Sequence, residues 1–348
     1  TGRAEITRAV VESMAYQTRD VVDAMTAARG TPLVELRVDG GAGAMDLLAK
    51  VLLPQVLGRS FAHPEAMARA FAPWRANFMA RATVEMAFWD LWAKSLNLPL
   101  QTVLGGEGDA IDVGGSLGIG PVPDTLDRVA AHLQQGYKRI KLKVKPGHDI
   151  GLLRAVRSEF PEAHLTVDAN CCYTLADSAL IAQMDDFGLD YLEQPLAWDD
   201  IHDHATLQQR IRTPLCLDEC IRTVEHARKA LQTDAARVIN IKVGRVGGHS
   251  AARQIHDLCQ SYQVPVWCGG MLESGIGRAH NIHLSTLPGF TKPGDTSSAS
   301  RYFTRDIIEQ KLETEGGRMP VPQGPGIGVT LDLDYLKTAT LSVQDFTA

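Results

Sequence analysis

Short runs of β-favouring residues alternate with amphipathic, helix-like stretches through the middle of this 348-residue chain. Seven such runs can be identified, at residues 111–118, 139–144, 164–169, 191–194, 215–218, 238–243 and 264–268. An eighth is expected just before Gly294-Asp295. Strands that alternate with helices of about 10 to 15 residues predict βαβ units and a parallel sheet. Because no glycine-rich dinucleotide loop follows the first run, a closed (β/α)8 TIM barrel is favoured over an open sheet.

The barrel is expected at residues 109–300, and the chain on either side of it has a different pattern. Residues 45–108 are predicted to be mostly helical and to form part of a capping domain. The strongest helical spacing lies at residues 81–94, where the recurring apolar residues are Val84, Phe88, Leu91 and Trp92. Residues 301–348 are expected to return to the barrel end and the cap, with one short strand at 328–331. The predicted fold class is therefore an α/β barrel with an α+β cap built from both chain ends.

The composition narrows the class of function. Hydrophobic residues make up 45% of the chain, which is enough to bury a large core. A net charge of −6 argues against nucleic-acid binding, which requires a basic surface. No apolar stretch approaches the ~18 residues of a membrane span. Because the six cysteines lack the spacing of a zinc site or a disulfide scaffold, we expect a cytoplasmic enzyme with reduced thiols.

Five ionisable residues recur at a nearly constant interval: Lys143, Asp168, Glu193, Asp218 and Lys242 are separated by 25, 25, 25 and 24 residues. Each lies at or near the end of a predicted strand, so the interval corresponds to one βα unit. Because side chains alternate along a strand, these residues are expected to point into the barrel. The basic run at 138–145 could instead be a solvated surface, but strand periodicity places its lysines on one inward face. Catalytic groups of a TIM barrel lie at this carboxyl-terminal mouth.

Three carboxylates that converge on one point repel one another and require a cation. All-oxygen ligands suit Mg²⁺ or Mn²⁺ rather than zinc, and Asp168, Glu193 and Asp218 would supply them. Lys143 and Lys242 lie on nearly opposite strands, and a divalent cation nearby lowers a lysine pKa toward the range of a general base. A metal also stabilises the ene-diolate that forms when a carboxylate loses its α-proton. The site therefore predicts this proton removal, and a base on each face would invert the carbon.

The motifs around these residues resemble the enolase superfamily and, within it, the muconate-lactonizing subgroup, whose members carry a lysine at the ends of the second and sixth strands. The matching segments are Lys141-Leu142-Lys143, Val167-Asp168-Ala169-Asn170, Glu193-Gln194-Pro195, Leu217-Asp218-Glu219 and Asn240-Ile241-Lys242. Residues 265–275 and 293–297 narrow the resemblance to the N-acylamino acid racemase / o-succinylbenzoate synthase family. This resemblance extends from about residue 45 to near the C-terminus.

The resemblance implies a role for each matched residue. Lys143 and Lys242 would be the two acid/base groups, and Lys141 would hold the substrate carboxylate or tune Lys143. The residues lining the substrate pocket would be Ser116, Gly270 and Met271, and those supporting the metal ligands would be Asn170, Glu219 and Asn240. Two reactions are implied, namely racemisation of N-acylamino acids and syn-dehydration to o-succinylbenzoate. In the dehydration Lys143 would remove the proton and Lys242 would stabilise charge.

Because other members of the superfamily catalyse other reactions, alternative substrates remain open. A dipeptide epimerase or a cycloisomerase would use the same kind of site. In each case the partner is a small carboxylate substrate, and the family resemblance also implies a homo-oligomer.

The first 44 residues do not follow this family. They are expected to form a helix at 4–28 and a strand and turn at 33–41, and they resemble a segment of glycerol kinase, in which Gly40-Gly41 would approach the nucleotide. A junction is expected near residues 43–48, so the sheet whose loops close over the barrel in this family is replaced or incomplete. Because such loops exclude water and complete the pocket, we expect impaired activity. The alternative is a catalytically inactive fusion that retains the barrel and the metal site.

Overall fold

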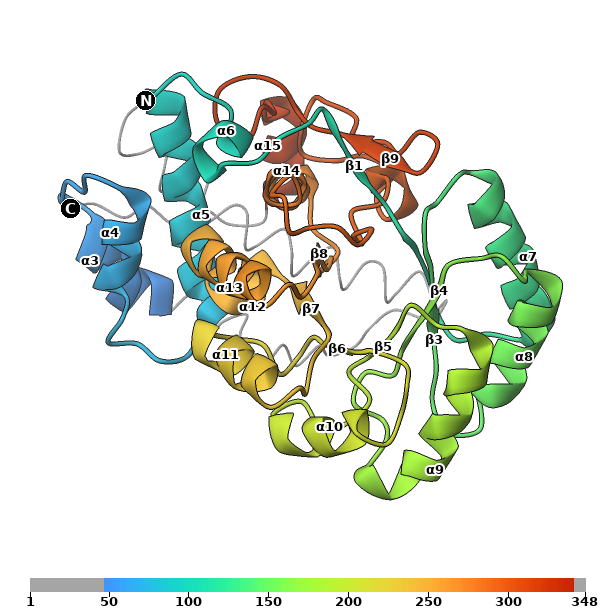
Figure 1. Cartoon of the computed structure of the whole chain (residues 1–348). Helices are drawn as coiled ribbons and strands as arrows, with labels where there is room; N and C mark the ends of the chain where they lie inside the picture. The colour runs from blue at the N-terminus through green and yellow to red at the C-terminus, as the bar shows by residue number, and fades with distance from the viewer. Residues whose placement is uncertain (1–46, 341–348) are drawn as a thin grey trace.

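The computed structural model describes residues 47–340 (Figure 1). The helix expected at 4–28, the strand and turn expected at 33–41, and Gly40-Gly41 lie outside the described residues. Those that are described form a parallel sheet with its connecting helices, a two-stranded antiparallel sheet, and a group of helices that precedes both in sequence.

Seven parallel strands form the central sheet, and each pairs with the next one in sequence. They are β2 (Gly115–Leu117), β3 (Ile140–Lys143), β4 (Leu165–Asp168), β5 (Tyr191–Glu193), β6 (Leu215–Leu217), β7 (Val238–Ile241) and β8 (Val266–Cys268). The main helices that follow these strands are α7 (Val122–Gln134), α8 (Ile150–Glu159), α10 (Ile201–Gln208), α11 (Val224–Gln232), α13 (His249–Ser261) and α14 (Gly275–Leu284). A one-turn helix, α12 (Val243–Val246), lies between β7 and α13. Parallel pairing in sequence order is the topology of a TIM barrel, which confirms the predicted fold class.

The segment expected to hold the eighth strand closes this sheet. The Asp295 amide donates to the Cys268 carbonyl at 2.9 Å, on the β8 side. On the other side, the Gly114 amide donates to the Gly294 carbonyl at 2.9 Å, and Val113 forms a parallel bridge with Gly294. The segment is too short to count as a strand, and Pro293 can donate no hydrogen bond to extend it.

Two sequence-based expectations about individual elements were wrong. The run 111–118 divides into β1 (Ala110–Asp112), which pairs with β9 (Arg318–Pro320), and β2 of the barrel. The division falls where Gly114 passes directly over a buried side chain, since a Cβ there would lie 2.5 Å from Cζ of Arg139. The strand expected at 328–331 is a single bridge from Leu331 to Ile308. Between β4 and β5 the chain forms three short helical turns: η2 (Leu175–Asp177), α9 (Ser178–Ile181) and η3 (Ala182–Phe187).

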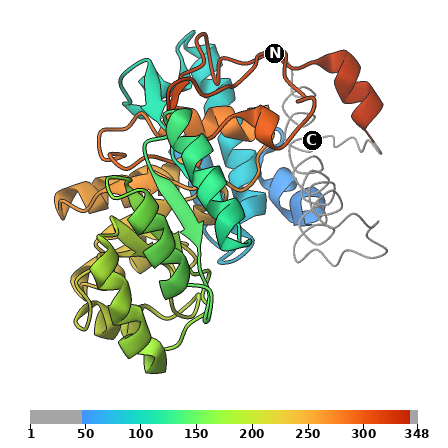
Figure 2. The same cartoon turned by 90° about the vertical axis from the view of Figure 1, so that its right-hand side faces the viewer.

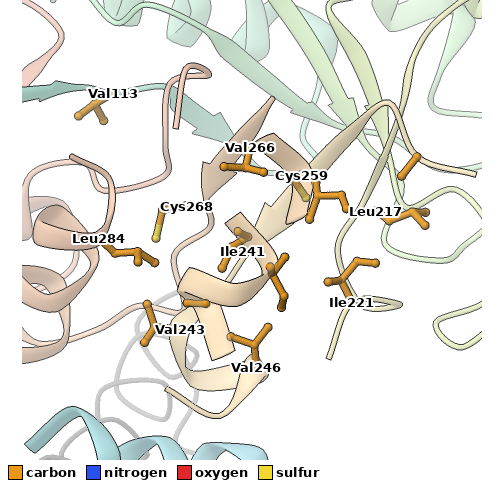
Figure 3. Packing of buried hydrophobic residues seen from close by; sticks show 14 of the residues in the cluster. Val113, Leu217, Ile221, Ile241, Val243, Val246, Cys259, Val266, Cys268 and Leu284 are labelled. Carbon is orange, nitrogen blue, oxygen red and sulfur yellow. The ribbon is translucent and has the colours of Figure 1, made fainter. Parts of the chain in front are cut away.

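Alternation along the strands produces two separate layers of buried side chains. One set faces the surrounding helices and belongs to the main core, which includes Leu142, Val167, Leu192, Ile239 and Val266. Figure 3 shows part of this layer, where Ile241 of β7 lies near Val243 of α12. The opposite set forms a smaller buried cluster, with Tyr191, Cys216, Val238 and Trp267 filling the barrel interior. Polar residues further along the same inward face therefore have a packed floor beneath them.

The N-terminal part of the described chain is helical. Its elements are η1 (Leu48–Leu52), α3 (Leu53–Val56), α4 (Pro64–Ala70), α5 (Phe78–Ser95) and α6 (Leu100–Leu104), and near the other end of the chain lie η4 (Ala299–Arg301) and α15 (Leu333–Ala339). Two views place α3 and α4 on the opposite side of the molecule from α8 (Figure 1, Figure 2). Between these regions α5 contacts α4 on one side and α12 and α13 on the other. Trp89 and Ala93 of α5 are fully buried although neither belongs to the predicted apolar stripe, whereas Phe88 of that stripe is only partly buried. Helix α5 therefore buries residues outside the predicted stripe.

Candidate active site

Strand β3 brings two lysines to the inward face of the barrel. The Lys143 ammonium donates to Oδ2 of Asp168 at 2.6 Å and also to Oδ1 of Asn170. Lys141 lies two residues deeper and is buried, with Nζ 3.1 Å from Oε2 of Glu193 and 3.5 Å from Oδ2 of Asp168. Burial alone would lower the pKa of Lys141, but the surrounding carboxylates raise it well above its ordinary value. Lys141 is therefore a permanent buried cation.

Three carboxylates occupy successive strand ends, as the spacing predicted. Asp168 and Glu193 are paired in register on β4 and β5, and Asp218 follows the last residue of β6. Their exposed fractions are 2%, 0% and 1%. Burial, followed by the charge of Asp168, raises the pKa of Glu193 to about 8. Burial also raises the pKa of Asp218, but cationic neighbours outweigh it and the resulting value is about 2.

The second predicted acid/base group stands at the end of β7, which three strands of the sheet separate from β3. Lys242 directly follows β7, and its Nζ donates to Oδ2 of Asp218 at 2.9 Å. Two residues earlier, Nδ2 of Asn240 donates to Oε1 of Glu193 at 2.9 Å, which supports the role expected of Asn240. Space for Lys242 depends on Gly269, since a Cβ there would lie 2.7 Å from Cε of Lys242. The side chains of Lys143 and Lys242 are 32% and 20% exposed, so both remain accessible from the mouth.

The remaining predicted site residues lie around the same mouth. Asn170 links Lys143 to Glu219, because its Nδ2 donates to Oε1 of Glu219 at 3.2 Å. Ser116 is paired in register with Lys141. Gly270 lies against the Asp295 carbonyl, where an added Cβ would be 2.9 Å away.

Met271 follows in the same loop. Its sulfur faces Gly244, at 3.8 Å from the position that a Cβ would occupy there. The structure therefore brings these residues to one end of the barrel.

Three polar residues of the site were given no role by sequence reasoning. Asp295, in the closing segment, binds two buried cations, with Oδ2 2.6 Å from Nζ of Lys141 and Oδ1 2.8 Å from Nη2 of Arg139. Arg245 on α12 donates to Oδ1 of Asp218 and, at 2.7 Å, to the Asn240 carbonyl. Oε1 of Gln194 accepts the Asp218 amide at 3.0 Å. Their positions in the sequence could have indicated them, since each lies within three residues of a matched site residue or inside a matched motif.

The donor set can be tested against a divalent cation. In residues 47–340, no three His, Cys, Asp or Glu side chains approach closely enough to hold a metal ion as they stand. Asp168, Glu193 and Asp218 instead accept hydrogen bonds from ammonium, guanidinium or amide groups. Their oxygens are nevertheless the ligands that Mg²⁺ and Mn²⁺ prefer. Burial and the charge of Asp168 raise the pKa of Glu193 to about 8 although Lys141 lies 3.1 Å away, so a bound cation would stabilise its ionised form. The residues fit such a cation chemically, provided that the carboxylates turn away from the lysines.

In comparisons with known proteins, the N-terminal end of the chain matches a different family from the rest. Residues 124–335 match the family described as Enolase C-terminal domain-like, and residues 39–105 match the Mandelate racemase / muconate lactonizing enzyme N-terminal domain. Residues 1–63 match the C-terminal domain of the FGGY family of carbohydrate kinases, in agreement with the resemblance of residues 2–44 to glycerol kinase.

Individual relatives are similar over most of the chain. An N-succinylamino acid racemase of Thermus thermophilus is 57% identical over 86% of this chain and 82% of its own length. An o-succinylbenzoate synthase of Geobacillus stearothermophilus is 50% identical over 86% and 80%. A solved structure of an enolase superfamily member from Listeria innocua is 41% identical, with a TM-score of 0.85 over 87% of this chain and 82% of that one.

Proposed function

This chain belongs to the enolase superfamily, and from that membership we propose that it removes the proton α to a carboxylate and racemises N-acylamino acids. The arrangement of Lys143 and Lys242 supports this proposal. They rise from different strands, remain accessible from the mouth, and are separated by the three carboxylates of the site. One ammonium group can therefore face each side of a substrate carbon bound between them.

Each residue has a distinct task in this proposal. One neutral lysine would accept the α-proton on Nζ, and the other would return a proton from its own Nζ to the opposite face. Asp168, Glu193 and Asp218 would hold Mg²⁺ or Mn²⁺, which would supply stabilisation of the negative charge that develops on the substrate carboxylate. Lys141 already donates to Glu193 and Asp295, and its Nζ lies 3.5 Å from Asp168. This favours a role for Lys141 in holding the ligands and tuning Lys143 over direct contact with substrate.

Syn-dehydration to o-succinylbenzoate is the second candidate. It is favoured by the o-succinylbenzoate synthases among the relatives, which are 40 to 50% identical to this chain. In this reaction Lys143 would remove the proton, and Lys242 would remain charged beside the developing anion. Dipeptide epimerisation has weaker support, because the L-Ala-D/L-Glu epimerase of Bacillus subtilis is 29% identical.

We further propose that turnover is lower than in a relative with the family's own N-terminal segment. The first 44 residues resemble a different family, and about a fifth of the length of the relatives lies outside the aligned region. Loops that exclude water and close the pocket would then be altered while the barrel mouth is kept. A catalytically inactive fusion is the limiting case.

The proposal also places the protein in the cytoplasm as a homo-oligomer. None of its described helices is long and apolar enough to cross a membrane.

The proposal is tested by following the α-proton of each enantiomer of an N-succinylamino acid in deuterated water with Mg²⁺. We expect exchange in the unmodified chain, loss of exchange from one enantiomer in K143A, and from the other in K242A. Formation of o-succinylbenzoate in a parallel assay distinguishes the second reaction. Exchange that survives in the double variant, or none in the unmodified chain, would contradict the proposed function.

A further inference from the structure

We propose that Glu85, on helix α5, is a positioning residue for Lys242 and does not act on Lys143. It would connect the helical segment at residues 47–108 to one of the two acid/base groups. The inference rests on the proposed function, since it assigns Lys242 a separate catalytic task. Its evidence is the position of one buried carboxylate at the start of helix α13.

Glu85 is fully buried and accepts four hydrogen bonds. Oε2 accepts the His249 amide at 2.7 Å, and Oε1 accepts the amide and the hydroxyl of Ser250 at 2.8 and 2.5 Å. Nε1 of Trp89, one helical turn further along α5, donates to the same Oε1 at 2.8 Å. The carboxylate thus satisfies backbone amides that have no partner within helix α13. Burial nonetheless outweighs these donors and raises the pKa of Glu85 to about 7.

The backbone leading to this contact is shaped around the carboxylate. Gly248, which precedes α13, has a φ of 116°, and a Cβ at this position would overlap the Glu85 carboxylate. Gly247 also has a positive φ, of 94°, and faces Phe78 at the start of α5, where an added Cβ would lie 3.5 Å from the ring. Two consecutive glycines therefore allow the turn to pass close beneath α5.

Hydrogen bonds connect this turn to Lys242 in two steps. The Gly248 amide donates to the Val243 carbonyl at 2.9 Å, and the Val246 amide donates to the Lys242 carbonyl at 3.1 Å. Lys242 is the N-cap residue of α12, the one-turn helix that these bonds complete and that packs along α5. A displacement of the turn at 247–250 would therefore move the backbone that carries Lys242.

The opposite lysine is held in another way. Lys143 lies on β3, paired in register with Asp168, and its ammonium binds Asp168 and Asn170. Its position depends on the neighbouring strand rather than on α5. The loss of the Glu85 contacts should consequently affect the two lysines unequally, whereas a general loss of folding would affect both.

The test uses Glu85→Gln, because glutamine keeps the shape but offers one acceptor oxygen and turns an NH2 group toward other donors. Glu65→Gln is the matched control, since Glu65 on α4 also reaches α13, through a partly exposed ion pair with Arg253 at 3.5 Å. K143A and K242A identify the enantiomer served by each lysine. We expect E85Q to slow exchange from the Lys242 enantiomer by about tenfold or more relative to the other enantiomer. E65Q should leave the ratio unchanged.

Amide hydrogen exchange provides a measurement that does not depend on catalysis. In E85Q the amides of residues 243–250 should exchange faster than in the unmodified chain and in E65Q. If E85Q does not fold, Ser250→Ala removes one donor and keeps the carboxylate, and it should shift both measurements in the same direction to a smaller degree. An unchanged enantiomer ratio, or unchanged protection of these amides, would overturn the inference. If the unmodified chain exchanges no substrate proton, the proposed function fails and amide exchange alone decides the role of Glu85.

Discussion

Replacing Asp295 by asparagine should destabilise the barrel more than any exposed charge change in this chain. Asp295 lies in the closing segment and binds two buried cations, Arg139 at 2.8 Å and Lys141 at 2.6 Å. Arg139 is 1% exposed and also stacks on Trp267, with Cζ 5.1 Å from the ring. An asparagine would leave both cations short of one negative charge, and Arg139 and Lys141 are only 1% and 4% exposed.

The magnitude follows from the cost of breaking a buried pair. Removing one partner of such a pair costs about 3 to 5 kcal/mol, because the other charge remains buried and uncompensated. For a folded body of about 300 residues the entropy of unfolding is about 0.6 kcal/mol per kelvin, so Tm should fall by roughly 5 to 8 °C. The assay is thermal or urea unfolding of D295N at pH 7. Asp112→Asn is the control, since Asp112 is exposed and 3.7 Å from Arg318, and its change should stay within about 0.5 kcal/mol.

Two further outcomes decide whether the reasoning holds. The cationic partners keep the pKa of Asp295 well below its ordinary value, although burial acts in the opposite direction. The carboxylate therefore stabilises the fold at neutral pH, and this contribution is lost as the pH falls below about 4, so D295N and the unmodified chain should converge in acid. The double variant R139M/D295N should be more stable than D295N, because it removes one stranded charge. A loss below about 1 kcal/mol in D295N at pH 7 would refute the argument.

The site supports two more predictions. Gly269→Ala should reduce turnover by about a hundredfold and cost about 1 to 3 kcal/mol of stability, because the new methyl group meets the side chains of Asn240 and Lys242. Gly118→Ala, where no atom lies within 4 Å, should leave turnover unchanged, and equal kinetics in the two variants would contradict the crowding. In metal-free protein, burial raises the pKa of Glu193 to about 8 from 4.5, so the native state keeps a proton that the unfolded chain releases. The free energy of unfolding should therefore fall between about pH 5 and 8, and Mg²⁺ should oppose this fall in urea titrations; a rise with pH would count against it.

The sequence predicted those parts of the site that repeat along it. Strand ends in a parallel barrel meet at one mouth, so an interval of one βα unit between Lys143, Asp168 and Glu193 is sufficient to bring them together. Period-two alternation then assigns each side chain to the inward face. Both rules use only local spacing, and both held at every strand that carries a predicted ligand or base.

The missed residues depend on contacts between distant parts of the chain. Glu85 and Ser250 are 165 residues apart, and neither stands out by periodicity, because Glu85 is a charged residue at the edge of the predicted apolar stripe. Asp295 meets Arg139 across 156 residues, at the one place where the barrel closes without a regular strand. The division of the run 111–118 has the same origin, since it follows from the approach of Gly114 to Arg139. Rules that use only local spacing cannot predict such close approaches.

Asp295 and Arg245 affect the proposed reaction because they contribute to the charge of the barrel mouth. The cations that line it are Arg139, Lys141, Lys143, Lys242 and Arg245, and the carboxylates they contact are Asp168, Glu193, Asp218 and Asp295. With a divalent cation bound, Glu193 would be ionised and one lysine would be neutral as the base. Four cations and the metal would then oppose four carboxylates, which leaves an excess of about two positive charges. A substrate carboxylate brings one negative charge. As its α-proton passes to the neutral lysine, a second negative charge develops on the substrate and a positive charge on that lysine, so the total stays constant while the dianion forms in the positive field of the mouth. Arg245 adds to this positive field and Asp295 limits it, so the loss of either should be felt in turnover more than in substrate affinity.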